Sequence, residues 1–132
     1  MTDKELLEIL CKRIDETRSG TQPSCKVDYL PARDSGICVQ MSLVPETVTR
    51  WLDGARGKMQ ATFSIIAQAT QDQISDAIVW LERAKGYLNQ LDQLDSGISI
   101  ISTTSTVPSK IGVLPDGTVR YGVTETIEYY EN

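Results

Sequence analysis

The chain has 132 residues, enough for one domain and short for two, and we expect residues 1–132 to fold as a single unit. It is 40% apolar and 23% charged, which fits a globular protein and excludes an intrinsically disordered one. The formal net charge of -5 argues against a general nucleic-acid binder, which needs a basic face for the phosphates. No apolar run approaches the ~20 residues that cross a bilayer, so we expect no membrane partner.

The first predicted element is an amphipathic helix near the N-terminus. Thr2 and Glu5 have the three-residue spacing of a capping box, and Gly20 marks the expected end of the helix. Residues 19–36 are polar and interrupted by glycine and proline, which predicts a loop with a short strand around Val27–Leu30. The helical stripe consists of Leu6, Leu7, Leu10 and Ile14.

Strands are predicted next. The segment "GICVQMSLV" (residues 36–44) alternates apolar and polar residues. "TVTRWL" (residues 47–52) is a shorter strand candidate, and a helical turn that begins at Pro45 and Glu46 is the alternative. Asp53 and Gly54 form a turn signal before a strand of about a dozen residues, longer than the usual 5–6. Such a length exceeds what a small core requires. The apolar side of this strand, expected to face the helices, consists of Met59, Ala61, Phe63, Ile65, Ala67 and Ala69.

A second amphipathic helix is predicted after this strand. Thr70 and Gln73 form a second possible capping box, and the helix is expected to end near Asp95, with Gly97 as the stop. Gly86 lies inside it and should cost about 1 kcal/mol relative to alanine. Its stripe consists of Ile74, Ala77, Ile78, Leu81, Leu88 and Leu91.

The last third of the chain predicts strands again. "ISIISTTSTV" is rich in β-branched residues, and "KIGVL" and "TVRYGVTETIEYY" flank the turn signal Pro115-Asp116-Gly117. The order of elements is helix, strands, helix, strands. It predicts an α+β fold with a mostly antiparallel sheet and both amphipathic helices packed on one face.

The sequence offers little for catalysis. Histidine is absent, which removes the commonest general base and metal ligand. Cys11, Cys25 and Cys38 lie far apart and form no CxxC pair, so neither a disulfide framework nor a zinc site is predicted, and reduced thiols are expected. We therefore predict a protein that is not an enzyme and has no catalytic, cofactor-binding or metal-ligating residues. A small enzyme or ligand-binding domain that uses carboxylates stays as an alternative.

Two residues are candidates for a contact between subunits. Ile66 is the one large apolar residue on the polar side of its strand, and Tyr130 also interrupts a polar side. One interpretation of Ile66 is a lone exposed isoleucine, which is common on protein surfaces. The other is that Ile66 and Tyr130 form a subunit contact together. In that case Ile66→Lys should leave the monomer folded and prevent assembly.

A family resemblance is carried by "WLDGARGKMQATFSIIAQATQDQISDAIVWLERAKGYLNQL". The segment resembles the tail-terminator and minor-capsid proteins of long-tailed bacteriophages. The matching features are the Asp53-Gly54 turn, Phe63 in a strand, the polar break Gln71–Gln73, and Ala77-Ile78 with Leu81 in a helix. The segments "YLPARDSGICVQ" and "IEYYEN" resemble that family as well.

This resemblance implies a structural role in the virion. The protein would cap the tail tube, end its polymerisation and offer a head-joining surface at the head-proximal end of the tail, after synthesis in the bacterial host cytoplasm. Its partners would be further copies of itself in a ring, expected to be a hexamer, together with the tail-tube protein and a head-completion or connector protein. DNA would pass through the ring without tight binding, and no cofactor is implied. Another phage connector, such as a head-completion or tail-tube protein, is the alternative.

Overall fold

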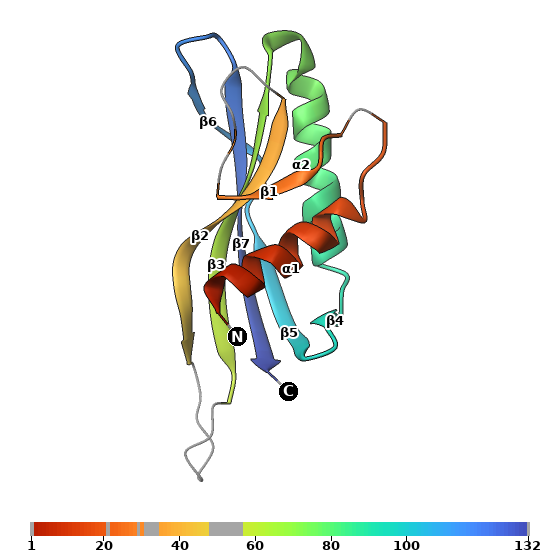
Figure 1. Cartoon of the computed structure of the whole chain (residues 1–132), viewed down its shortest axis with the longest axis vertical. Helices are drawn as coiled ribbons and strands as arrows, with labels where there is room; N and C mark the ends of the chain where they lie inside the picture. Colours follow the sequence, from red (N-terminus) through yellow and green to blue (C-terminus); the bar gives the residue numbers. More distant parts are fainter. Residues whose placement is uncertain (1, 21, 29, 31–34, 48–56, 132) are drawn as a thin grey trace.

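The computed structural model describes residues 2–20, 22–28, 30, 35–47 and 57–131. The strands form a sheet in the order β1-β2-β3-β7-β5-β4, with β6 also paired to β7 (Figure 1). Only the β1–β2 pair is parallel among the described residues, so the predicted α+β fold with a mostly antiparallel sheet is confirmed. The elements are α1 (Asp3–Asp15), β1 (Cys25–Val27), β2 (Gly36–Thr47), β3 (Met59–Ala69), α2 (Ile74–Leu88), β4 (Gln93–Asp95), β5 (Ile98–Ser105), β6 (Ser109–Val113) and β7 (Val119–Glu131).

Both helices cover the same face of the sheet, as predicted. Helix α1 packs on β1 and β2, and α2 packs on β3 and β7 (Figure 1). The core lies between the helices and the sheet, and Phe63 is fully buried in it. The predicted alternation along β3 is confirmed, because every residue of its apolar side is buried in this core: Met59, Ala61, Phe63, Ile65, Ala67 and Ala69.

Helix α1 begins as predicted and ends early. Thr2 and Glu5 form the capping box, with hydrogen bonds of 3.1 and 3.3 Å. The helix ends at Asp15, five residues before Gly20, which has a left-handed φ of +60°. The Asp15 carboxylate then accepts a 2.7 Å hydrogen bond from the backbone N–H of Cys25. This contact helps to hold the short strand at Cys25–Val27, earlier than the predicted Val27–Leu30.

Strand β2 is longer than predicted. It continues through Pro45 to Thr47, with irregular pairing to β3 between Met41 and Glu46. Such bulges accommodate a proline, which cannot donate a ladder hydrogen bond. The rest of the separate strand predicted at residues 47–52, and the Asp53-Gly54 turn, lie outside the described residues.

Helix α2 differs from its prediction at both ends. The capping box does not form, because the Thr70 hydroxyl donates to the Asp72 carboxylate and the Gln73 side chain accepts from Ser35 at 2.6 Å. A 3-10 turn at Gln71–Gln73 precedes the helix instead. The helix ends at Leu88 rather than near Asp95, because the chain turns back to pair β4 with β5 and to bury Leu94.

The C-terminal strands follow the prediction. Gly117 has a φ of +90° in the turn between β6 and β7, a conformation that favours glycine. Strand β7 is shared along its length: β5 pairs with its C-terminal half and β6 with its N-terminal end. Between them the backbone N–H of Thr106 donates to the carbonyl of Thr124 at 3.0 Å. Strands β5 and β6 therefore lie on the same side of β7 as one interrupted strand, and β4 pairs only with the start of β5.

Candidate functional site: the uncovered face of the sheet

The face of the sheet opposite the helices carries hydroxyl and amide side chains. Across β2 and β3, the Ser42 and Ser64 hydroxyls are hydrogen-bonded at 2.8 Å, and across β3 and β7 those of Thr62 and Thr126 at 3.1 Å. We call this hydroxyl-rich area the outer face. Its exposed or half-buried polar residues include Gln40, Ser42, Thr62, Ser64, Ser102, Thr104, Thr124 and Thr126.

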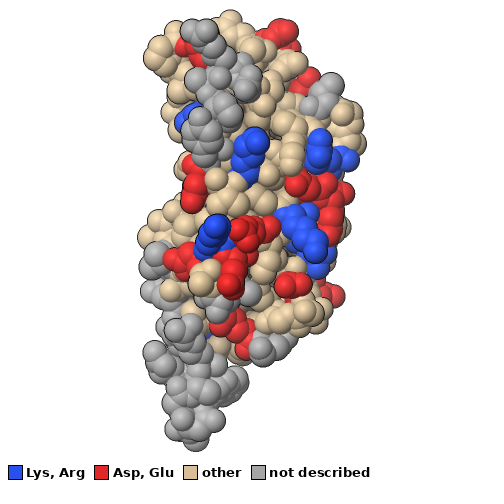
Figure 2. Space-filling view, in the orientation of Figure 1, with Lys and Arg blue, Asp and Glu red and all other residues tan. Residues whose placement is uncertain are grey.

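Charged groups on the outer face are paired. Lys58 and Glu128 form an ion pair of 2.8 Å, and the Lys58 ammonium lowers the pKa of the Glu128 carboxyl. Arg120 donates to the Gln68 side chain at 2.8 Å. On the opposite side of the molecule, where α1 lies in front of the sheet, Figure 2 shows basic and acidic side chains intermingled rather than separated into areas of one sign. The contacts on the outer face itself, two hydroxyl pairs, one ion pair and the Arg120–Gln68 hydrogen bond, offer hydrogen-bonding groups more than net charge.

Ile66 lies on the predicted side of β3, but the expectation that it is exposed is wrong. Its side chain is only 8% exposed, because it packs with Leu30 and Cys38 in a small apolar cluster. Cys38 is the direct neighbour of Ile66 on β2. Leu30 comes from the segment before β2, which the sequence pattern did not place over the sheet. Both interpretations took Ile66 to be exposed on the surface of the monomer, and in the structure its side chain is buried.

Tyr130 lies far from Ile66. Both residues are on the outer face, but Ile66 is opposite Gly122, eight residues before Tyr130 on β7. At about 3.4 Å per residue the two positions are roughly 27 Å apart along the strand. The structure thus does not bring them together in one patch. Tyr130 is half-buried, and its role in a contact between copies stays a prediction.

Ile66→Lys is now expected to destabilise the monomer by roughly 2 kcal/mol, because it places an ammonium group in the Leu30–Cys38 cluster. Urea unfolding followed by circular dichroism measures this change. Ile66→Val is the matched control, since it keeps an apolar side chain and should cost about 1 kcal/mol. A Lys variant as stable as the wild type would show that the cluster does not exclude water.

A second surface is apolar and lies at the β5–β6 edge. Val107, Ile111 and Val113 are each more than half exposed. The Ile111 side chain lies over Gly122, where an added Cβ would come within 2.5 Å of its Cδ1 atom. Exposed apolar residues on an edge strand are unusual, because such edges invite pairing with another chain. This β6 edge is therefore a second candidate for contact with a partner.

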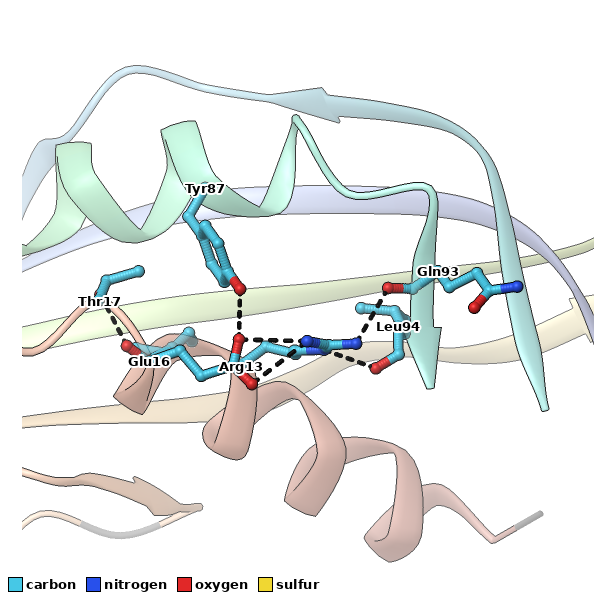
Figure 3. A network of polar contacts seen from close by, with 7 residues as sticks. Arg13, Glu16, Thr17, Tyr87, Gln93 and Leu94 are labelled. Atoms are coloured by element: carbon cyan, nitrogen blue, oxygen red, sulfur yellow. Dashed lines mark hydrogen bonds and ion pairs between the residues drawn. The ribbon is translucent and has the colours of Figure 1, made fainter. Parts of the chain in front are cut away.

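A polar network joins the two helices to β4 (Figure 3). The Arg13 guanidinium donates to the carbonyls of Leu94 at 2.8 Å and Gln93 at 3.4 Å, and it pairs with Glu16 at 3.1 Å. Tyr87 of α2 donates its hydroxyl to the same Glu16 carboxylate. The Tyr87 hydroxyl, followed by Arg13, lowers the pKa of Glu16. Each group is engaged by its neighbours, so the network is a structural clamp rather than a reactive centre.

Arg13→Lys is expected to reduce the free energy of unfolding by about 1–2 kcal/mol, because an ammonium cannot reproduce the fork that reaches both carbonyls and Glu16. Thermal and urea melts measure the loss. Lys4→Met is the control, because the Lys4–Glu8 pair is exposed and should contribute little. Equal stability of the two variants would contradict the clamp.

The described residues contain few of the features of a catalytic centre. Within them, no group of three or more cysteine, aspartate or glutamate side chains could hold a metal ion. A shallow hollow of about 140 Å³ beside Arg13 is lined by Ile9, Lys12, Leu94 and Asp95 together with the Arg13–Glu16 pair. No helix in the described ranges combines the length and apolar character needed to span a membrane.

Sequence reasoning missed two buried features. The Cys11 and Cys25 sulphurs lie 3.0 Å apart, and their spacing gives no signal because the contact joins a helix to a distant strand. Glu125 is fully buried between Phe63 of β3 and Ser105 of β5, and within the described residues neither carboxylate oxygen has a partner in hydrogen-bond geometry, although the Ser105 hydroxyl is near enough to lower its pKa. A signal for Glu125 did exist, since it shares the buried parity of Val123 and Ile127 on β7.

Comparison with known proteins supports the fold alone. One solved structure, whose name states no function, matches with a TM-score of 0.55. The match covers 100% of this chain and 98% of that chain, at 14% sequence identity. At this identity the likeness shows a shared architecture. No family model and no curated protein matches the chain.

Proposed function

We propose that the chain is a structural virion protein of long-tailed bacteriophages that caps the tail tube, ends its polymerisation and provides the head-joining surface as a ring. The observation that carries the proposal is the outer face, which neither α1 nor α2 covers and which extends along β3 and β7, strands of 11 and 13 residues. Strands of this length exceed the usual 5–6 residues, and an assembly would use the excess. The sequence resemblance points to the same role.

The surface chemistry is consistent with this proposal. Hydroxyl and amide groups dominate the outer face, and the chain carries 18 acidic against 13 basic residues. A ring with such surfaces would let DNA pass without holding it, because tight binding needs many Lys or Arg contacts to phosphates. The exposed apolar residues of the β6 edge, Val107, Ile111 and Val113, would contact the next copy in the ring.

The test is an assembly assay with the full chain. Light scattering after gel filtration gives the mass, and negative-stain images show the protein alone and with tail tubes. We expect a ring of six 14.6 kDa chains on the tube, and no further growth of the capped tube. A chain that polymerises into tubes by itself would favour a tail-tube protein instead. A monomer that leaves tube ends unchanged would refute both roles.

A matched pair of variants locates the contact. Val107→Lys alters the most exposed residue of the β6 edge, whereas Thr104→Lys adds the same charge to an exposed position on the outer face. If the β6 edge joins neighbouring copies, the first variant should lose rings while keeping its melting temperature, and the second should keep them. The reverse result would place the contact on the outer face.

A further inference from the structure

Cys11 and Cys25 come together between α1 and the edge strand β1. Their Sγ atoms are 3.0 Å apart, about 1 Å longer than the bond of roughly 2.05 Å in a disulfide. Both side chains are buried, with 7% and 8% of their surface exposed. The two thiols are thus already neighbours in the folded chain, and a small displacement would bring them to bonding distance.

An independent contact fixes this approach. Asp15 lies four residues after Cys11, so the two share one face of α1. Its carboxylate accepts hydrogen bonds from the Cys25 backbone N–H at 2.7 Å and from the Ser24 hydroxyl at 3.3 Å. The end of the helix therefore holds the start of β1 so that the Cys25 side chain meets Cys11.

The third cysteine lies on the other side of the sheet. Cys25 is paired with Ile37, which belongs to the main core, whereas Cys38 packs with Leu30 and Ile66. Because successive residues of a strand point to opposite faces, the Cys38 side chain is directed away from the Cys11–Cys25 pair. Cys38 is therefore an internal control for the pair, because it is also a buried cysteine but lies on the opposite face of the sheet.

We propose that Cys11 and Cys25 form a reversible disulfide that ties α1 to the β1 edge when the protein meets a disulfide oxidant. With glutathione disulfide, one cysteine thiolate attacks a glutathione sulphur, forms a mixed disulfide and releases one glutathione thiol. The second cysteine then attacks the protein sulphur and releases the other glutathione. Two protein thiols are oxidised, one glutathione disulfide is reduced, and the two thiol protons pass to the released glutathione thiolates.

The environment favours a reduced pair until such an oxidant is supplied. The hydrogen bond with Cys11, followed by burial, raises the pKa of the Cys25 thiol. A raised thiol pKa lowers the thiolate fraction, and the thiolate is the nucleophile in exchange. Oxidation should consequently be slow. The inference does not depend on the proposed virion role, so failure of either leaves the other standing.

The experiment equilibrates the full chain in glutathione buffers of increasing oxidised fraction, followed by denaturation, alkylation and intact-mass measurement. We expect two thiols to be lost together, a Cys11–Cys25 linked peptide, and one remaining alkylated residue, Cys38. Cys38→Ser should give the same transition. Mixed glutathione adducts without a linked peptide, a link that includes Cys38, or three alkylated thiols at the most oxidising buffer would overturn the proposal.

Melting temperatures and the equilibrium constant for disulfide formation separate the effect of the disulfide from the effect of a substitution on folding. Closing the 15-residue loop from Cys11 to Cys25 should raise the melting temperature of the wild type by about 10 °C, and that of Cys38→Ser equally. In Cys11→Ser the same oxidant should cause no shift. Asp15→Ala should lower the equilibrium constant for disulfide formation at least about tenfold, because the contact that positions Cys25 is removed. An unchanged constant would refute the positioning role of Asp15.

Discussion

Phe63→Ala is expected to destabilise the protein by about 3–5 kcal/mol, a large part of the stability of a small domain. Phe63 is the only phenylalanine of the chain, and its ring is fully buried between β3 and the helices. Its cross-strand neighbours are Met41 on β2 and Glu125 on β7, so the cavity would open at the centre of the sheet. Urea unfolding followed by circular dichroism measures the loss.

The adjacent residue provides the control for this prediction. Ser64 lies on the outer face, where its hydroxyl is hydrogen-bonded to Ser42 at 2.8 Å. Ser64→Ala removes one exposed hydrogen bond and should cost at most about 1 kcal/mol. Equal effects at Phe63 and Ser64 would mean that the two faces of β3 are not distinguished as the structure shows.

The pattern of apolar residues predicted most of the sheet because burial imposes a period of two on a strand. Strands β3 and β7 each have one face on the core and one face on the outside, so their alternation was readable. Glu125 shares the parity of Val123, but it was not predicted to be buried, because a charged side chain does not match the apolar pattern. The capping box at Thr2 was also local and therefore predictable.

Contacts between distant segments explain what the sequence did not reveal. Helix α2 ends at Leu88 because β4 pairs with β5 and Arg13 of α1 binds the carbonyl of Leu94. Ile66 is covered by Leu30, which lies 36 positions earlier in the chain. Such contacts depend on how the chain returns to the sheet, and no local spacing encodes them. The Cys11–Cys25 pair and the separation of Ile66 from Tyr130 have the same origin.

The buried carboxyl of Glu125 makes the stability of this fold depend on pH. Burial raises the pKa of its carboxyl from 4.5 to about 7, although the Ser105 hydroxyl and the Lys85 ammonium oppose the shift. The Asn89 side chain donates to the Ser105 oxygen at 2.9 Å, which leaves the Ser105 hydroxyl proton free to turn toward Glu125. The site thus favours a neutral carboxyl, and ionisation at neutral pH opposes folding.

Glu125→Gln is therefore expected to stabilise the protein above pH 7 by up to about 3 kcal/mol and to change little below pH 4.5. Below pH 4.5 the carboxyl is protonated in both the folded and the unfolded chain, so its full contribution is present. Between pH 4.5 and 7 the unfolded chain releases the proton first, and stability falls as pH rises. Above pH 7 both states are ionised and the loss is constant.

Urea unfolding of the wild type and of Glu125→Gln at several pH values between 4 and 8 measures the difference in their free energies of unfolding. Taking this difference removes the contributions of the titrating groups that the two proteins share. Glu128→Gln is the matched control, three residues away on the outer face, where the pKa is lowered by the ion pair with Lys58 and the hydrogen bond from Ser102. Because a lowered pKa means that ionisation favours folding, this control should be less stable than the wild type at pH 7 and equal to it in acid. A Glu125→Gln variant that is no more stable at pH 8 than the wild type would show that water or a cation reaches the carboxylate.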